Sequence, residues 1–189
     1  GPYAYLAPGL GIAGGNIERD LVTVRDVAAE YGAEDCVPRA FLAHSRYDRD
    51  WVLRVLYRHV LSRQSRPVIA IWGLAYKPNT RSTKNSPTLA LLDALHEVTV
   101  QLYDPSATLD RDYPDVFQSR SGLDACHGAH ALVIMTPWEE FSTISMTAVK
   151  KALVESIVID PSGSWDHRDT VAPGFLYATL SCPLQAVKA

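Results

Sequence analysis

The sequence has few features that would direct the chain to a membrane, to nucleic acid or to an oxidising compartment. No stretch approaches the roughly 20 consecutive apolar residues of a membrane span. The formal net charge is −3 and the pI is about 6.1, so no basic field favours nucleic acid. The three cysteines, Cys36, Cys126 and Cys182, show neither CxxC nor zinc spacing. We therefore expect a cytoplasmic protein with reduced thiols that contacts neither membranes nor nucleic acid.

Patterns for metal and dinucleotide binding are lacking as well. One local cluster combines a cysteine with histidines, Cys126, His127 and His130, and it has no fourth ligand. We expect structural or surface roles for these residues and no metal site. The first predicted strand is followed by a single glycine and not by GxGxxG, which argues against a dinucleotide pyrophosphate site in this chain.

The features that are present divide the chain into two parts. Its 47% hydrophobic and 21% charged residues are typical of a globular protein. Residues 1–65 combine a glycine-rich opening with helical patterns, whereas residues 66–189 alternate strands and helices. Because domains seldom begin with an unanchored glycine-rich loop, we expect the chain to be part of a larger protein.

Two helices are predicted in the first part. Apolar residues recur at helical spacing from Glu18 to Tyr31, and Gly32 suits the position after a helix end. A second helix is predicted from Pro38 to Arg63, and its length of about 39 Å exceeds what so small a core can cover. We therefore expect its apolar stripe to form a homodimer interface. The candidate interface residues are Trp51, Val55 and Leu56.

The second part has the alternating pattern of a parallel α/β domain. The predicted strands are 68–72, 98–103, 131–136, 156–160 and an edge strand at 175–178. The predicted helices are 86–97, 123–127, 138–141 and 146–154. The fold expected is α/β, a Rossmann-like doubly wound parallel sheet that follows the helical dimerisation segment.

The most informative segment runs from Trp72 to Pro87. Gly73 allows the chain to turn at the end of a buried strand, Lys77 supplies a cation, and Ser86 begins a helix as its N-cap. A cation and a free helix N-terminus thus lie at the carboxyl end of a parallel strand, where α/β proteins bind phosphate. Lys77 is therefore a candidate phosphate contact.

This segment resembles the "GLAFKPNTDDVRESP" signature of the UDP-glucose/GDP-mannose dehydrogenase family, which belongs to its C-terminal nucleotide-sugar-binding domain. The resemblance implies that Lys77 contacts the diphosphate of a UDP- or GDP-linked sugar. Two shorter segments, 103–105 and 131–141, resemble the family's "YDP" and "ADALVILTEWDEF". We interpret these as a strand end and as a strand that leads into a helix.

The glycine-rich opening resembles the family's "PGxGFGGSCLPKD" loop and aligns with it without a gap from Gly11 to Asp20. In the family this loop carries a cysteine that traps an aldehyde covalently, so that an alcohol is oxidised to an acid through a thioester. Asn16 occupies the position of that cysteine, which closes this route. The resemblance implies that Asp20 assists proton transfer. It also implies that Gly11, Gly14, Gly15 and Arg19 contact the substrate.

A third family match fails, because Ser162 stands where "DGRN" has an arginine that helps to hold the diphosphate. The family's NAD-binding domain is not in this chain. We expect NAD to bind only where such an N-terminal domain is present, no cofactor to bind to this chain, and no hydride transfer by it alone.

Three interpretations stay open from the sequence. The chain is the C-terminal part of a nucleotide-sugar dehydrogenase, a non-catalytic binding or dimerisation relative, or part of an enzyme whose two-electron chemistry needs no thiol.

Overall fold

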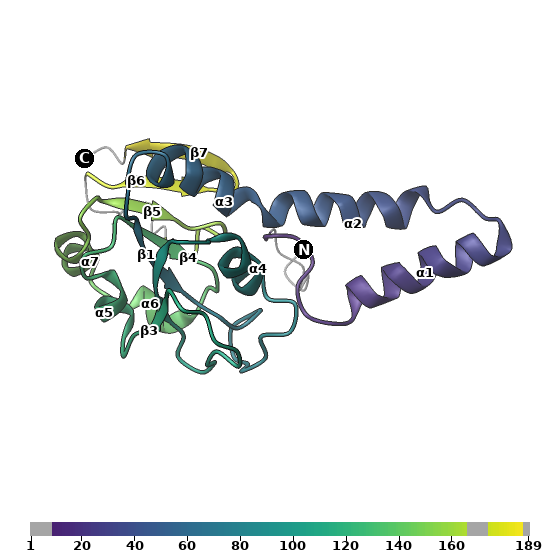
Figure 1. The fold of residues 1–189 in the computed structure, drawn as a ribbon, viewed down its shortest axis with the longest axis horizontal. Helices are drawn as coiled ribbons and strands as arrows, with labels where there is room; N and C mark the ends of the chain where they lie inside the picture. The colour runs from purple at the N-terminus through teal and green to yellow at the C-terminus, as the bar shows by residue number, and fades with distance from the viewer. Residues whose placement is uncertain (1–8, 166–173, 187–189) are drawn as a thin grey trace.

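A seven-stranded sheet organises the second part of the chain, as the computed structural model shows for residues 9–165 and 174–186 (Figure 1). The strand order is β3-β2-β1-β4-β5-β6-β7, and every neighbouring pair is parallel except β6 and β7. The first six strands follow the order of a doubly wound Rossmann sheet, which confirms the predicted fold class. The strands are β1 Val68–Trp72, β2 Thr99–Tyr103, β3 Val116–Gln118, β4 Ala131–Ile134, β5 Ile157–Ile159, β6 Leu176–Thr179 and β7 Cys182–Ala186.

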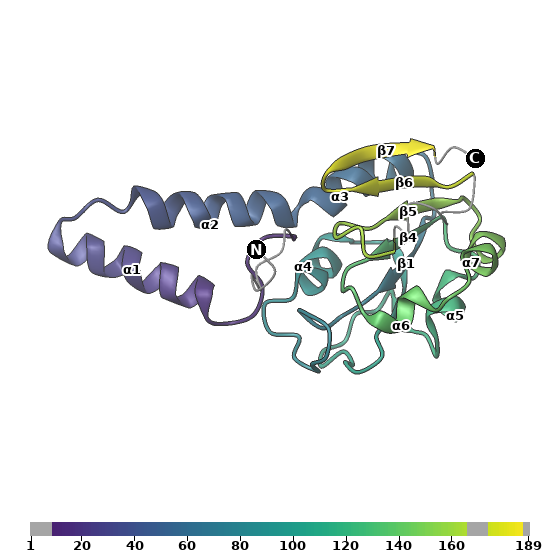
Figure 2. The same cartoon turned by 180° about the vertical axis from the view of Figure 1, so that it is seen from behind.

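Helices cover both faces of this sheet because its central strand is apolar on both sides. Ile69 and Ile71 of β1 join a core that contains the leucines of α4. Ala70 and Trp72, which point the opposite way, join a second core with α5, α6 and α7. Figure 2 shows α4 on one side of the sheet and α5–α7 on the other. These helices are α4 Pro87–Ala94, α5 Gly122–Cys126, α6 Glu139–Ser142 and α7 Met146–Ala152.

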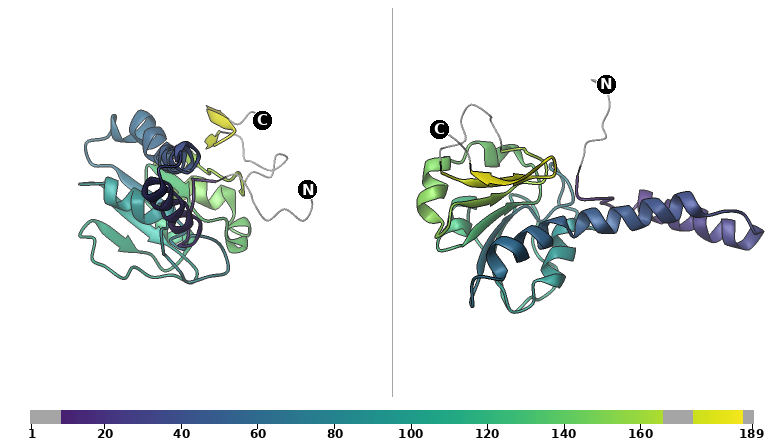
Figure 3. Two further views of the ribbon diagram at one scale, coloured as in Figure 1. Left: turned by 90° about the vertical axis from the view of Figure 1, so that its right-hand side faces the viewer. Right: turned by 90° about the horizontal axis from the view of Figure 1, so that it is seen from above.

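The first part of the chain forms a helical hairpin. Its helices, α1 Ile17–Tyr31 and α2 Cys36–Arg49, pack side by side and project away from the sheet (Figure 3). Gly32 ends α1 in the left-handed conformation, with φ of 66°, and donates its N–H to the carbonyl of Ala28. The predicted first helix and its glycine end are therefore confirmed.

The prediction of a single long helix from Pro38 to Arg63 is wrong. The structure has α2, then α3 Trp51–Leu56, and then a π-helical turn, η1 Tyr57–Leu61. α3 and η1 lie on the sheet and bury Val52, Leu56 and Val60 completely in the same core as α4.

This packing also corrects the predicted interface residues. Leu56 is fully buried within its own chain and cannot meet a partner, while Trp51 and Val55 pack partly against the same core. The apolar stripe reflects contact with the sheet, which sequence spacing does not distinguish from contact with another chain. The proposed division of the chain at residues 65/66 stays a prediction.

The edges of the sheet differ from expectation. β6 is not an edge strand, since β7 pairs with it antiparallel, and β3 forms the opposite edge. β3 has only three residues, and β7 contains Pro183, which a strand tolerates at an edge. The sequence therefore gave little sign of either strand. In the parts of the chain that the structure describes, no helix is both long and apolar enough to cross a membrane.

Candidate functional site

The β1–α4 loop, residues 73–86, is fixed by hydrogen bonds to its own neighbours. Gly73 adopts φ of 100°, and a Cβ at this position would come within 2.5 Å of Thr136, so only glycine fits the turn. Ser86 is confirmed as the N-cap of α4, because its Oγ accepts the N–H of Thr88 at 3.2 Å. The same hydroxyl donates to the carbonyl of Leu74 at 2.7 Å. Both ends of the loop are thus fixed by contacts within the domain.

Asp104, at the end of β2, connects three of the loops at this edge of the sheet. Its Oδ2 accepts the N–H groups of Leu74 and Ala75 at 2.7 and 2.9 Å and the indole N–H of Trp138 at 3.2 Å. Its Oδ1 accepts the N–H groups of Ser106 and Ala107 at 2.8 and 2.7 Å. Five donors use the full accepting capacity of the carboxylate, so Asp104 organises the site and has no capacity left for a ligand.

Three cations stand on the β1–α4 loop without an anionic partner. Lys77, Arg81 and Lys84 are exposed and form no ion pair within residues 9–165 and 174–186. The ammonium group of Lys77 lies 5.6 Å from the centre of the Tyr76 ring. No acidic residue occurs between residues 73 and 86 to neutralise these charges. The loop therefore offers concentrated positive charge at the carboxyl edge of the sheet.

The glycine loop, residues 9–16, is bound between α2 and the β1–α4 loop. On the α2 side, Ile12 donates its N–H to Ser45 Oγ at 2.8 Å and accepts from Arg49 Nη2 at 2.9 Å. On the other side, Asn85 Nδ2 donates to the carbonyl of Ile12 at 3.3 Å and also to Glu18. Arg49 Nη2 also lies 4.0 Å from Glu18 Oε2, so this cation is paired, while its buried Nε has no partner among the described residues.

The glycines that were predicted as substrate contacts pack closely against neighbouring protein groups, and Gly11 and Gly14 also have positive φ. A Cβ on Gly14 would lie 3.1 Å from the Tyr76 ring, and one on Gly15 would lie 2.5 Å from Lys84 Cε. Gly11, at φ of 74°, packs directly against Ser45. The structure therefore brings two segments about 60 residues apart in sequence, around Gly14 and Tyr76, into one site.

The other predicted residues of the opening segment lie at the start of α1. Asn16 is the exposed N-cap of that helix, and its side chain forms no capping hydrogen bond. Arg19 and Asp20 pair with each other at 2.9 Å on the exposed helix surface. Within the described part of the chain, no hydrogen bond or ion pair links Arg19 or Asp20 to Lys77. Pro8, which aligns with the first letter of the family's "PGxGFGGSCLPKD" loop, lies outside the described residues.

None of the cysteines is placed to substitute for a nucleophile at Asn16. Cys126 is fully buried at the end of α5, and burial raises the pKa of its thiol to about 12, so it is not a thiolate near neutral pH. Cys36 begins α2 at the far end of the hairpin, and Cys182 lies in the edge strand β7.

Ser162 has a structural role in a turn after β5. It donates to Asp160 Oδ1 at 2.9 Å, and Asp160 is fully buried. The N–H of Trp165 and the hydroxyl of Tyr177 each donate to Asp160 Oδ2 at 2.7 Å. The Asp160 carboxylate orders the turn. Ser162 supplies no positive charge that could contact a ligand.

In the Cys126, His127 and His130 cluster, His130 and Cys126 take part in the packing of the sheet domain. His130 Nδ1 accepts the N–H of Val68 at 3.1 Å, and Cys126 is buried. Within residues 9–165 and 174–186, no group of three or more such side chains could hold a metal ion.

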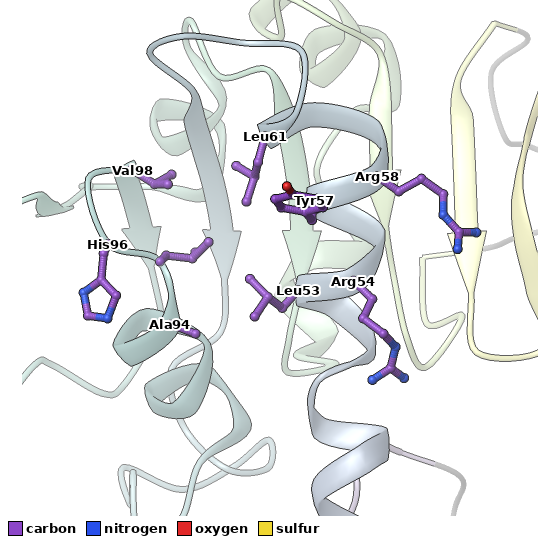
Figure 4. Close-up of a pocket in the computed structure, with 9 residues that line it drawn as sticks. Leu53, Arg54, Tyr57, Arg58, Leu61, Ala94, His96 and Val98 are labelled. Carbon is purple, nitrogen blue, oxygen red and sulfur yellow. The ribbon is translucent and has the colours of Figure 1, made fainter.

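A pocket of about 520 Å³ opens at the opposite edge of the sheet from the β1–α4 loop (Figure 4). Leu53, Tyr57 and Leu61 form one side of it, facing His96 and Val98. These residues precede β1 and β2, so the pocket lies at the amino ends of the strands. In Figure 4 the guanidinium groups of Arg54 and Arg58 point away from the leucines. None of the predicted site residues contributes to it.

A Rossmann-order sheet that places a rigid cationic loop and a docked glycine loop at its carboxyl edge defines a nucleotide-binding α/β domain. Residues 70–167 match the model of the UDP binding domain of the UDP-glucose/GDP-mannose dehydrogenase family. The chain belongs to this family.

Relatives support the assignment over most of the chain. The chain is 25% identical over 189 residues to UDP-glucose 6-dehydrogenase of Pseudomonas aeruginosa, covering 95% of this chain and 42% of the relative. It is 26% identical over 190 residues to UDP-glucose 6-dehydrogenase TuaD of Bacillus subtilis, covering 95% and 40%. The chain thus spans about two fifths of the length of these relatives.

Solved structures share the fold. A UDP-D-ManNAc dehydrogenase from Pyrococcus horikoshii superposes with a TM-score of 0.74 at 22% identity, covering 94% of this chain and 41% of that one. A GDP-mannose dehydrogenase from Pseudomonas aeruginosa superposes with a TM-score of 0.64 at 14% identity, covering 96% and 42%.

Some residues of the site were missed from the sequence. Asp104 was interpreted as a strand end, and Arg81, Lys84 and Tyr76 were not singled out. The absence of acidic residues from the loop was a usable signal for the two cations. The role of Asp104 depends on contacts among three separate loops, which no local pattern reveals.

Proposed function

We propose that this chain is the nucleotide-sugar-binding and dimerisation portion of a dehydrogenase of this family, with Lys77 as a contact to the ligand's diphosphate. The observation that carries the proposal is the presence of Lys77, Arg81 and Lys84 without ion-pair partners on a rigid loop next to the glycine loop. A diphosphate would neutralise this charge, and the glycines let the glycine loop approach the β1–α4 loop closely.

In this proposal Gly11, Gly14 and Gly15 shape the sugar side of the site. Arg19 and Asp20 act at its outer rim, and Asn16 stands at the position of the family's nucleophile. Oxidation of the sugar would require NAD held by a dinucleotide-binding domain outside this chain, which supplies the hydride acceptor. The chain alone would bind a nucleotide sugar and would not oxidise it.

A second candidate function is that of a non-catalytic binding relative. Asn16 favours it, because an amide nitrogen has no lone pair available for nucleophilic attack. In both cases we place the protein in the cytoplasm.

The proposal includes a homodimer. We place its interface on the α1–α2 hairpin and not on Trp51, Val55 and Leu56. Val24, Val27 and Tyr31 of α1 are 49–77% exposed, and Val37 and Phe41 of α2 are 60% and 57% exposed. Phe41 and its neighbours on α2 line a shallow apolar pocket of about 520 Å³. Exposed apolar residues at this density on a projecting hairpin indicate a surface that a partner covers.

Calorimetry with UDP-glucose and GDP-mannose tests the binding function. We expect binding of at least one of them, and Lys77→Ala should weaken it about tenfold or more, because a charge-assisted phosphate contact contributes roughly 1.5–3 kcal/mol. Arg63→Ala is the matched control, since Arg63 is exposed and precedes β1 at the amino edge of the sheet. Absence of binding by both nucleotide sugars would contradict the proposal.

A further inference from the structure

Side chains from two other elements hold the backbone of the glycine loop at Ile12. Arg49 Nη2 donates to the carbonyl of Ile12 from α2 at 2.9 Å, and Asn85 Nδ2 donates to it from the β1–α4 loop at 3.3 Å. The N–H of Ile12 donates to Ser45 Oγ at 2.8 Å, and Ser45 is buried. Both backbone polar groups of Ile12 are therefore tied to elements outside the glycine loop.

Glu18, in the first turn of α1, joins these donors. Its carboxylate accepts from Asn85 Nδ2, and its Oε2 lies 4.0 Å from Arg49 Nη2. The amide nitrogen of Asn85 has two hydrogens, so it can donate to Ile12 and to Glu18 at the same time. We call Glu18, Arg49 and Asn85 the loop junction. It links α1, α2 and the β1–α4 loop around a single backbone carbonyl.

The loop junction balances one cation against one anion. Arg49 is always charged, and its side chain is only 16% exposed. Within residues 9–165 and 174–186, Glu18 is the only carboxylate within 4 Å of this guanidinium. Removing one partner of a largely buried ion pair costs more than the intact pair contributes, because the remaining charge has lost both water and counter-charge. The junction therefore requires one carboxylate.

Two departures from the family motifs fall on the loop junction. The "PGxGFGGSCLPKD" motif has proline where this chain has Glu18, and the "GLAFKPNTDDVRESP" motif has glutamate where it has Asn85. Each pattern thus supplies one carboxylate, at position 85 in the motifs and at position 18 in this chain. Because Asn85 Nδ2 and Arg49 Nη2 converge on one oxygen, a carboxylate at either position can reach the guanidinium.

The junction holds the chain on both sides of the segment that faces the β1–α4 loop. Residues 12 and 18 are the two points of attachment, and Gly14, Gly15 and Asn16 lie between them. In this segment a Cβ on Gly14 would lie 3.1 Å from the Tyr76 ring, and one on Gly15 would lie 2.5 Å from Lys84 Cε. The close approach of the two loops is therefore framed by the junction.

We propose that Glu18, Arg49 and Asn85 are positioning residues that set the glycine loop against the β1–α4 loop. They act through the backbone of the glycine loop and do not contact the ligand themselves. This inference rests on the proposed function, in which the glycine loop shapes the sugar side of the site. It adds that the position of that loop depends on one carboxylate, which residue 18 supplies in this chain.

The test is a double-variant cycle on the charge of the junction. Glu18→Gln leaves Arg49 with no carboxylate, Asn85→Glu gives it two, and the combination of both changes gives it one again. Glu30→Gln is the matched control, since Glu30 is exposed on the same helix and has no hydrogen bond or ion pair among the described residues.

Two measurements are made on each variant. Amide hydrogen exchange of Ile12 reports local opening of the glycine loop, and exchange of Gly73, whose N–H donates to the carbonyl of Tyr103 at 2.8 Å, reports on the sheet. Calorimetry compares UDP-glucose and GDP-mannose with UDP and GDP. A loss confined to the nucleotide sugars separates a shift of the glycine loop from a general loss of stability.

We expect each single variant to speed exchange of Ile12 about tenfold and to weaken binding of the nucleotide sugar about tenfold. Exchange of Gly73, binding of UDP or GDP, and the control should be unchanged. Glu18→Gln should reverse sign in the cycle: it is harmful alone and beneficial when added to Asn85→Glu. Any backbone cost of a glutamate at φ of 51° is present in both variants that carry it, so it does not affect this comparison.

The outcomes separate this inference from the proposed function. If a nucleotide sugar binds with Lys77 dependence but Glu18→Gln is harmful in both backgrounds or in neither, the inference is wrong and the proposed function stands. Equal weakening of UDP and UDP-glucose would also contradict it. If neither nucleotide sugar binds the unmodified protein, the proposed function is overturned, and exchange of Ile12 alone decides whether the junction holds the loop.

A variant that fails to fold would be recognised from its amide spectrum. The cycle is then made with Arg49→Gln in place of Asn85→Glu, so that the combined variant removes both charges of the pair. Its effect on exchange of Ile12 should be smaller than the product of the two single effects. An effect equal to that product would show that the two residues act independently, which would contradict the inference.

Discussion

Trp138 donates its indole N–H to Asp104 Oδ2 at 3.2 Å, and this bond links the loop after β4 to the loops after β1 and β2. The carboxyl edge of a parallel sheet brings together loops that are far apart in the sequence. In this protein a single carboxylate holds three of them, so the arrangement of these loops depends on one residue.

Replacing this carboxylate should lower stability. In Asp104→Asn one oxygen becomes an NH₂ group, which would face N–H donors and leave at least two of them unsatisfied. We expect a loss of about 2–4 kcal/mol in the free energy of unfolding, measured by the urea midpoint at unchanged slope. Asp112→Asn is the control, because Asp112 is exposed and makes no hydrogen bond or ion pair among the described residues. Equal midpoints for the two variants would contradict the role given to Asp104.

The turn after β1 should tolerate only glycine. Gly73→Ala would place a methyl group 2.5 Å from Thr136 at φ of 100°, and we expect a loss of about 2–4 kcal/mol. Gly32→Ala is the matched control, since Gly32 has φ of 66° but open space around its Cβ position. It should cost only about 1 kcal/mol, the conformational penalty alone. Similar costs for both variants, measured by thermal unfolding, would show that the contact with Thr136 is unimportant.

The sequence predicted the parts of this fold that depend on neighbouring residues. Local propensity predicts the strand 68–72, the N-cap at Ser86 and the end of α1 at Gly32. The structure confirms each of these three predictions. The function of the apolar stripe in α3 was misassigned, because Leu56 has the same helical spacing whether it packs on a sheet or on a second chain. The hydrogen bonds of Asp104 and the approach of Lys84 to Gly15 arise only when separate loops meet.

Association should depend on the hairpin and not on α3. Phe41 is 57% exposed on α2 and lines the apolar pocket of the hairpin. We expect sedimentation to show a dimer at tens of micromolar, and Phe41→Glu should shift it to the monomer, because burying an unpaired charge in an apolar interface is costly. Tyr57→Glu is the control, since Tyr57 is 66% exposed on η1, away from the hairpin. A monomeric unmodified protein at that concentration would rule out the dimer.

The last prediction concerns the chemistry at Asn16, the exposed N-cap of α1. A full-length protein that joins this chain to an NAD-binding domain should not carry an alcohol to an acid through a covalent thioester. Loss of a nucleophile usually lowers the rate by several orders of magnitude, to what positioning and electrostatics supply. Asn16→Cys should restore the trap, measured as two equivalents of NADH for each nucleotide sugar, whereas Asn16→Ser should not. If the unmodified full-length protein already gives two equivalents and a uronate, another residue forms the covalent intermediate and the role assigned to Asn16 is wrong.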